Sequence, residues 1–438
     1  NTMIRFAAAL FLGAAAALPA RAEVDIQTIT SSGGIGAWLV EEHSLPFVAL
    51  QIAFRGGTSL DVEGKRGAVN LMAGLLEEGS GELDARAFAR ATEELATSFS
   101  FSSSPDDLTI SARFLTENFD ASVALLRDAI QSPRFDEADI ERVRAQVLSS
   151  LAFAAKDPND IASKAFAAMA YGDHPYGTDE SGTPESVAAL TRDDLVEAHR
   201  NVLVRDRVLI GAVGDITPEQ LGNLVDALLG DLPQSGPKMP PKVEPQIEGG
   251  LTVVDFDTPQ SVAVFGQRGI DIDDDDFFAA VLVNHILGGG SFESRLMQEV
   301  REKRGLTYGV YSFLSARDLA NSYMGQVSSS NDRIAEAVSV IKEQWQLVAE
   351  NGVTEEELGS AKTYLTGAYP LRFDGNATIA GILVGMQLIG LDADYVKTRN
   401  ELVERVTMED VRRVAGELMD PEGLHFVVVG KPEGLSGD

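Results

Sequence analysis

The 438-residue chain contains no cysteine, only five histidines and only two tryptophans. The absence of cysteine excludes disulfide bonds and the cysteine anchor of a lipoprotein. Basic residues are also scarce, since 36 Lys and Arg stand against 67 Asp and Glu and the formal net charge is −31. This balance argues against nucleic acid as a partner, because phosphate binding needs clustered Lys and Arg, and against docking on anionic lipid.

Long hydrophobic runs are nearly absent, and the one that stands out lies near the start of the chain. Arg5 precedes an apolar run over residues 6–18, which is followed by the small-x-small sequence of residues 20–22. This pattern predicts a secretory signal peptide over residues 1–22. The run is too short to cross a bilayer, so no membrane association is predicted. An alanine-rich signal on a cysteine-free chain favours the periplasm of a Gram-negative bacterium.

Prolines gather in the middle of the chain. Residues 232–250, LPQSGPKMPPKVEPQIEGG, contain five prolines and three glycines and interrupt all periodicity. We interpret them as a linker between an N-terminal domain over residues 23–231 and a C-terminal domain over residues 251–438. Two domains also suit the length of the chain.

The two parts resemble each other in sequence. Thr191 and Thr407 each begin a capped helix that leads through a turn into a β-rich strand. The strands end at Gly214 and Gly430, which are 216 positions apart, as are the two threonines. Two further pairs follow the same order, beginning at Phe135 and Val353 and at Ala68 and Ala280. These matches predict a tandem duplication of one unit.

The β-rich runs cluster along the chain and do not alternate one-to-one with helices. Residues 47–54 and 108–115 are typical of strands, whereas residues 117–131 and 333–350 have the periodicity of amphipathic helices. This arrangement predicts an α+β protein made of two homologous tandem α/β units. Each unit is expected to form a mainly antiparallel sheet with helices packed on one face.

The histidines are too scattered to predict a metal site. A hydrolytic zinc site needs about three protein ligands, and no two histidines stand three or four positions apart. We interpret all five as surface or packed residues, and a zinc site built from distant residues remains the alternative: His43, His174, His199, His285 and His425. The predicted helix within residues 66–80, RGAVNLMAGLLEEGS, is also empty of strong ligands before Glu77.

The order of these segments resembles the insulinase and pitrilysin-like zinc peptidases, the inverzincins, which include mitochondrial processing peptidase. The resemblance covers nearly all of the chain after residue 22. In that family, two His of the motif G-x-x-H-x-x-E-H bind zinc and its Glu polarises the attacking water. When the motif is placed on Gly67, its His, Glu and His positions fall on Asn70, Ala73 and Gly74. The resemblance therefore implies that this half of the zinc site is lost.

The third zinc ligand of the family is a Glu on a later helix. The corresponding segment here is RVRAQVLSSLAFAAKDP, and the matching positions are Ser149 and Ser150. Either serine could occupy the position of the Glu, and neither replaces it as a zinc ligand. The resemblance thus implies no metal and no catalytic residue in this chain, with zinc held by a partner.

The second half keeps a segment that resembles the substrate-binding signature of the family. The sequence SRLMQEVREKRGLTYGVYSF contains Arg301 and Tyr308, seven apart like the Arg and Tyr that hold substrate in active relatives. A guanidinium and a phenol can donate to substrate carbonyls, and the phenol also to a developing oxyanion. The alternative is that Arg301 is an ordinary charge on a helix and Tyr308 packs on a strand. Arg304 is the nearby competitor, and Tyr311 is interpreted as packing.

A glycine run precedes this segment. Gly288, Gly289 and Gly290 resemble a shortened form of the glycine-rich loop in the non-catalytic subunit of mitochondrial processing peptidase. Three glycines would let the backbone lie close to a peptide. A helix C-cap followed by a turn explains the run equally well.

The resemblance implies a catalytically incomplete subunit of a heterodimeric zinc metallopeptidase. An H-x-x-E-H partner of the same family would carry the zinc, and this chain would supply Arg301 and Tyr308 to the peptide substrate. The alternative is a stand-alone periplasmic peptide-binding protein without proteolysis. A peptidase that is active alone through unrecognised ligands is a third hypothesis, against which the missing ligands argue.

Overall fold

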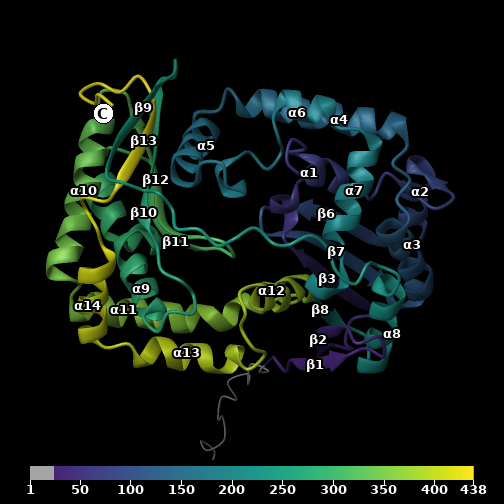
Figure 1. Cartoon of the computed structure of the whole chain (residues 1–438). Coiled ribbons are helices and arrows are strands. Elements are labelled where there is room, and N and C mark those ends of the chain that lie inside the picture. The colour runs from purple at the N-terminus through teal and green to yellow at the C-terminus, as the bar shows by residue number, and fades with distance from the viewer. Residues whose placement is uncertain (1–23, 438) are drawn as a thin grey trace, which may run out of the picture.

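The computed structural model describes residues 24–437 and consists of two α+β halves that face each other (Figure 1). The predicted signal peptide of residues 1–22 lies outside the described residues. Residues 233–249 contain no helix or strand and lead from one half to the other.

The first half contains a six-stranded sheet in which every neighbouring pair is antiparallel except β2 and β8. In spatial order its strands are β1 (Gln27–Thr30), β2 (Gly36–Glu41), β8 (Val208–Gly214), β3 (Phe47–Arg55), β7 (Asp107–Leu115) and β6 (Ser98–Ser103). Two short strands, β4 (Gly79–Ser80) and β5 (Leu83–Asp84), pair separately.

Helices of the first half cover one face of this sheet. Its main core joins residues of β3, such as Leu50 and Ile52, to Leu71, Leu126 and Leu224 from three helices. The helices of this half are α1 (Ala68–Ala73), α2 (Ala85–Glu94), α3 (Phe119–Gln131), α4 (Glu137–Ala154), α5 (Pro158–Tyr171), α6 (Pro184–Ala189), α7 (Arg192–Val202) and α8 (Pro218–Leu229).

The second half repeats this plan with five strands. In spatial order they are β9 (Gly250–Asp255), β13 (His425–Gly430), β10 (Gln260–Arg268), β12 (Asn321–Ser330) and β11 (Val310–Ala316). Its helices are α9 (Phe277–Asn284), α10 (Ile334–Asn351), α11 (Glu355–Ala368), α12 (Asn376–Leu388), α13 (Tyr395–Arg405) and α14 (Met408–Leu418). Two π-helical turns, His285–Gly289 and Met297–Glu302, lie between α9 and β11.

The duplication predicted from the sequence is visible in the details of both halves. The one parallel pair of the second sheet, β9 with β13, corresponds to β2 with β8. Thr191 and Thr407 both form capping boxes at the N-termini of α7 and α14. Gly214 and Gly430 end β8 and β13 with φ of 141° and 149°, a backbone conformation that favours glycine. The α+β fold of two tandem units is confirmed.

Each sheet also receives a helix from the opposite half on its second face. The α12 helix packs on β3 and β8, where Ala380 and Leu383 contact Ala49 and Val213. Gly211 permits this approach, because a Cβ there would lie 2.8 Å from the backbone oxygen of Ala380. The sequence predicted helices on one face of each sheet. That prediction holds for the helices of the same half, and a helix of the opposite half covers the second face.

The α5 helix makes the reciprocal contact with the second sheet. Its Ala162 and Phe166 pack on Val264 of β10 and Val429 of β13. Because both faces of β10 are covered, seven consecutive residues of that strand are buried. A nearly continuous apolar run is the expected sequence of such a strand.

Polar contacts join the halves at the turn between β11 and β12. The Arg55 Nη1 atom donates to both carboxylate oxygens of Asp318 at 3.0 and 2.9 Å, and its Nη2 donates to the backbone oxygen of Gln387 at 2.8 Å. Arg317 pairs with Asp106 at 3.2 Å, and its guanidinium carbon lies 3.6 Å from the ring centroid of Tyr176. Adjacent residues of one turn therefore bind three different segments of the first half.

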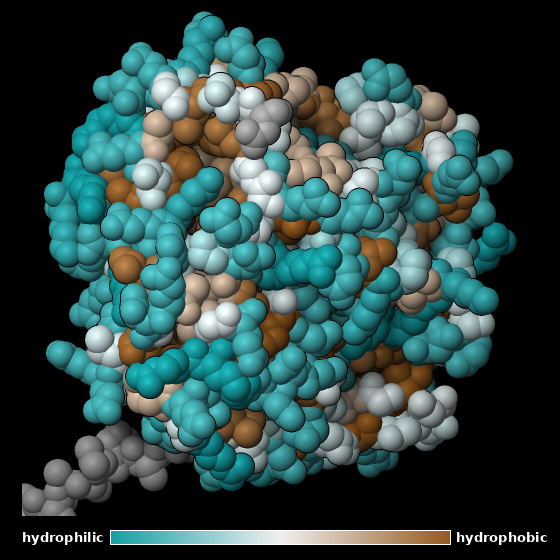
Figure 2. Space-filling model, turned by 60° about the vertical axis from the view of Figure 1, so that its left-hand side comes forward, coloured by the Kyte–Doolittle hydropathy of each residue, from teal (hydrophilic) through white to brown (hydrophobic). Residues whose placement is uncertain are grey.

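Figure 2 shows a largely hydrophilic face on which hydrophobic residues form small separate groups. This distribution agrees with the excess of acidic residues. Among the described residues, no helix is both long and apolar enough to cross a membrane.

Candidate functional site

The short helix α1 is held in place by a buried carboxylate at its N-terminus. The Asp61 side chain is 3% exposed and accepts hydrogen bonds from the backbone amides of Gly67 and Val69, both at 2.8 Å. Burial raises the pKa of Asp61, and these two amides together with Arg66 oppose that shift. The carboxylate stabilises the start of a helix whose first amides lack partners.

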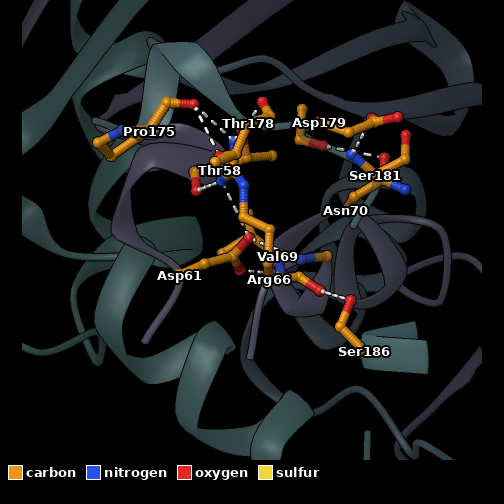
Figure 3. Close-up of polar contacts among 12 residues, drawn as sticks. Thr58, Asp61, Arg66, Val69, Asn70, Pro175, Thr178, Asp179, Ser181 and Ser186 are labelled. Carbon is orange, nitrogen blue, oxygen red and sulfur yellow. Dashed lines mark hydrogen bonds and ion pairs between the residues drawn. The ribbon is translucent and has the colours of Figure 1, made fainter. Parts of the chain in front are cut away.

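Arg66 ties the same helix start to a distant loop (Figure 3). Its guanidinium donates to the backbone oxygens of Thr58 and of Pro175, the latter at 3.0 Å. The Ser186 hydroxyl in turn donates to the backbone oxygen of Arg66 at 2.8 Å. The scaffold that would position a zinc-binding helix is therefore well ordered.

The helix itself carries no zinc-binding side chain at the expected positions. Asn70 accepts a hydrogen bond from the Ser103 hydroxyl of β6 at 3.4 Å. Ala73 is 2% exposed, and Gly74 caps the C-terminus of the helix. A Cβ at Gly74 would lie 3.2 Å from Val143 of α4, so this position faces the helix that carries the later ligand in the family.

The two serines on α4 lie beyond that contact. Ser149 and Ser150 are exposed in the last part of the helix. Within residues 24–437, no group of three His, Cys, Asp or Glu side chains is arranged to hold a metal ion.

Each of the five histidines has a hydrogen-bond or ring contact within the described chain. The Nε2 atoms of His174 and His199 interact with the backbone oxygens of Pro241 at 3.2 Å and Ile130 at 2.7 Å. Burial lowers the pKa of both imidazoles, which favours their neutral forms. His43 and His425 adjoin β2 and β13, and His285 begins the first π-helical turn.

Arg301 lies in the second π-helical turn with its guanidinium over an aromatic ring. The guanidinium carbon is 4.7 Å from the ring centroid of Phe292, which is itself 58% exposed. Its nearest carboxylate is that of Glu302, at 3.5 Å. The competitor Arg304 differs, because its Nη1 donates to both the backbone and the side chain of Glu299, at 2.8 and 2.7 Å.

Tyr308 is the most exposed of the large hydrophobic residues in the described chain, at 89%. It precedes β11, and no hydrogen bond within residues 24–437 involves its hydroxyl. Tyr311 contrasts with it, because its hydroxyl donates to Gln326 at 2.8 Å and its ring stacks on Phe313. Tyr311 is therefore engaged within its own sheet, whereas Tyr308 is not packed on a strand.

The glycine run adjoins the strand that follows Tyr308. Gly288 and Gly289 border a pocket of about 410 Å³, whose opposite wall is formed by residues 309–312. Gly288 is buried, and a Cβ there would collide with Ser312. Gly288 and Gly289 thus lie beside β11, whereas Gly290 caps the first π-helical turn. No direct interaction joins Arg301 to Tyr308 within residues 24–437.

The contacts that join the two halves were not predicted from the sequence. Arg317 and Asp318 stand in a turn that has no distinctive motif, and their ion-pair partners are more than 200 positions away. Asp61 and Arg66 were missed as well, although a carboxylate shortly before a helix is a recognisable capping signal.

Comparisons with known proteins identify the family to which this fold belongs. The family model described as insulinase (peptidase family M16) matches residues 38–183, and the model described as the peptidase M16 inactive domain matches residues 189–365. The chain belongs to the peptidase M16, or insulinase, family. The match to the inactive-domain model begins before α7 in the first half and ends within α11 of the second half.

Relatives in this family bear different descriptions. The chain is 28% identical to the non-peptidase homolog YmxG of Helicobacter pylori, over 89% of this chain and 90% of that protein. It is 31% identical to the uncharacterized zinc protease Rv2782c of Mycobacterium tuberculosis, over 70% of this chain and 71% of that protein. A solved structure of a peptidase M16 inactive domain from Pseudomonas fluorescens matches with a TM-score of 0.87 and 27% identity, covering 95% of this chain and 99% of the other.

Proposed function

We propose that the chain is the non-catalytic subunit of a heterodimeric zinc metallopeptidase in the periplasm. In this proposal an M16 partner carries the H-x-x-E-H motif and the zinc. This chain supplies Arg301 and Tyr308 to the peptide in the partner's site. The proposal is supported by family membership, by the residues on α1, and by the signature retained before β11.

The exposure of Tyr308 is the observation that carries the proposal. An aromatic side chain that is 89% exposed leaves apolar surface in water and contributes little to folding. The neighbours Arg304 and Tyr311 are engaged within the chain, whereas Arg301 and Tyr308 retain donors for an outside group. The two side chains that remain available are the two that match the substrate-binding positions of the family signature.

The chemistry of both side chains suits a peptide in a metallopeptidase site. A guanidinium can donate two hydrogen bonds to carbonyl oxygens of an extended peptide and so fix its register. A neutral phenol can donate to the oxygen of the scissile carbonyl as negative charge develops on it. Zinc on the partner would polarise that carbonyl and activate the attacking water.

The first experiment identifies the partner. The tagged chain is isolated from the periplasm of its source organism, and proteins that accompany it at equal stoichiometry are identified. The proposal expects an M16 chain with an intact H-x-x-E-H motif. Recovery of the chain alone would contradict the heterodimer.

The second experiment tests the two residues in the reconstituted pair. Tyr308→Phe is expected to lower kcat/KM by about a hundred- to a thousandfold, the range seen when a transition-state donor is removed. Arg301→Ala is expected to lower it by about ten- to a hundredfold, because the peptide loses charge-assisted hydrogen bonds. The matched controls Arg304→Ala and Tyr311→Phe are expected to change it less than about threefold. Size-exclusion chromatography checks that all four variants still assemble. Full activity of Arg301→Ala and Tyr308→Phe would refute the assigned roles.

A stand-alone peptide-binding function is the second candidate, favoured by the position of β11. This strand lies at the edge of its sheet, pairs with β12 on one side and borders the 410 Å³ pocket. An extended peptide could add to such an edge. Peptide binding by the isolated chain, without any co-purifying M16 subunit, would favour this function over the heterodimer.

A further inference from the structure

A second pocket, of about 490 Å³, lies beside α12 and away from Arg301 and Tyr308. It is bordered by α9, by residues 369–373, by α12 and by residues 391–399, and we refer to it as the α12 pocket. Figure 1 shows α12 between the two halves, with α13 below it. The volume falls within the range of about 300–1,000 Å³ that is usual for small-molecule sites.

The walls of the α12 pocket are mainly apolar. Phe277, Phe278 and Val281 contribute from α9, and Ile382 and Met386 contribute from α12. An apolar pocket with few polar groups favours a ligand with an apolar body.

Glycine keeps the α12 side of the pocket open. Gly385 lies in the last turn of α12 and its φ is not positive, so its helical backbone does not require glycine. A Cβ at this position would meet no heavy atom within 4 Å. Glycine within a helix lowers stability relative to alanine. Gly385 leaves open space beside the helix.

Two arginines without acidic partners border the same pocket. Arg399 donates to the backbone oxygen of Leu365 at 2.8 Å and to Asn400 at 3.0 Å, and its guanidinium lies 4.6 Å from the ring centroid of Tyr369. Within residues 24–437, neither Arg399 nor Arg372 forms an ion pair, although acidic residues outnumber basic ones by nearly two to one.

The position of Arg399 makes a bound anion favourable. Burial lowers the pKa of its guanidinium, and the nearby charge of Arg372 acts in the same direction. A partly buried charge without a counter-ion is destabilising, and an anion placed beside it relieves that penalty.

We propose that the α12 pocket binds a small amphipathic carboxylate of the fatty-acid class. The carboxylate pairs with Arg399 and Arg372, and the hydrocarbon chain lies along the open side of α12 at Gly385. The opposite side of α12 packs on β3 and β8 of the first half. A bound ligand therefore also stabilises the helix that joins the two halves.

Dodecanoate below its micellar concentration is a suitable probe, with binding measured by isothermal titration calorimetry. We expect one dodecanoate per chain and a rise in Tm on binding. Gly385→Phe fills the pocket and should abolish binding. Gly359→Phe is the matched control on α11, because a Cβ at Gly359 also meets nothing within 4 Å. It should bind dodecanoate like the wild type.

The contribution of the charge is tested separately. Arg399→Gln should weaken dodecanoate binding by about ten- to a hundredfold, the range expected for a charge-assisted hydrogen bond. Dodecan-1-ol, which lacks the charge, should bind the wild type more weakly by a similar factor. If Arg399→Gln does not fold, Arg372→Gln at an exposed position provides the same test with a smaller expected loss.

Three results would overturn the proposal. One is the absence of dodecanoate binding to the wild-type chain. Another is binding to Gly385→Phe with the affinity of the wild type, which would place the molecule elsewhere. The third is equal affinity for dodecanoate and dodecan-1-ol, which would remove the role of the arginines.

Discussion

Arg55 joins the two halves, and its replacement by methionine measures how much this contact contributes to stability. Arg55→Met keeps an aliphatic side chain but removes the guanidinium that binds Asp318 and the backbone oxygen of Gln387. The two charged side chains are mostly buried, with exposures of 29% and 21%. Hydrogen bonds to charged groups contribute about 1.5–3 kcal/mol, and these three share one guanidinium, so we expect a loss of about 2–4 kcal/mol.

The free energy of unfolding is measured by urea titration with linear extrapolation, and two spectroscopic probes monitor the same transition. Arg405→Met is the matched control, because Arg405 pairs with Glu401 at 3.3 Å where the side chains are 73% and 67% exposed. This exposed pair should contribute less than about 1 kcal/mol. A loss for Arg55→Met no larger than that of the control would refute the reasoning.

The pH dependence gives a second measurement on the same variant. Burial raises the pKa of the Asp318 carboxyl, and Arg55 opposes the shift. Because the folded pKa lies above the unfolded value, the ionised carboxylate destabilises the fold at neutral pH and protonation relieves this as pH falls. Removal of Arg55 raises the folded pKa further. The loss in Arg55→Met should therefore be largest near neutral pH and shrink on acidification, and a constant loss would exclude Asp318 as its source.

Three other substitutions test the fold with the same titration. Gly430→Ala should lower stability by about 1–3 kcal/mol, because its φ is 149° and a Cβ would collide with Ser261, whereas Gly359→Ala should raise stability by up to about 1 kcal/mol. Equal effects of these two would contradict the strain at Gly430. Gln267→Leu should lower stability by about 3–5 kcal/mol, because it removes the hydrogen bonds of this side chain. They join Gln267 to the buried Trp345 Nε1, at 2.7 Å, and to three backbone groups. A loss below about 1 kcal/mol would show that these groups find other partners.

The internal repeat was readable because its signals are local. Thr191 and Thr407 satisfy the amides of the turn that follows them, so each capping box is encoded within four residues. Gly214 and Gly430 mark a backbone conformation that other residues avoid. A capping threonine and a glycine with positive φ therefore appear at matching positions in both copies of the unit.

The exchange of helices between the halves has no comparable signal. The segment of α12 is apolar on nearly all sides, which predicts a buried helix but not the sheet that buries it. The α5 segment is rich in alanine and reads as an ordinary helix of its own half. Their partners lie on strands that are far away in the sequence, and helical periodicity carries no information about such distant contacts.

The candidate site was predicted in part. The residues at the motif positions, Asn70, Ala73 and Gly74, could be read directly, because a missing ligand is a local fact. The exposure of Tyr308 and the ring beneath Arg301 depend on how the chain turns before β11. The α12 pocket was not foreseen, since four separate segments enclose it.

Because α5 and α12 each pack on the sheet of the opposite half, the segment that connects the halves has a role beyond linking two independent domains. Either half, produced as a separate fragment, would expose one bare sheet face and one unpaired apolar helix. A cut within residues 233–249 would therefore yield two fragments that recover the fold only by finding each other. The segment between them acts as a tether that sets the effective concentration of one fragment around the other. In this sense the single polypeptide is a covalently linked dimer of its own repeats.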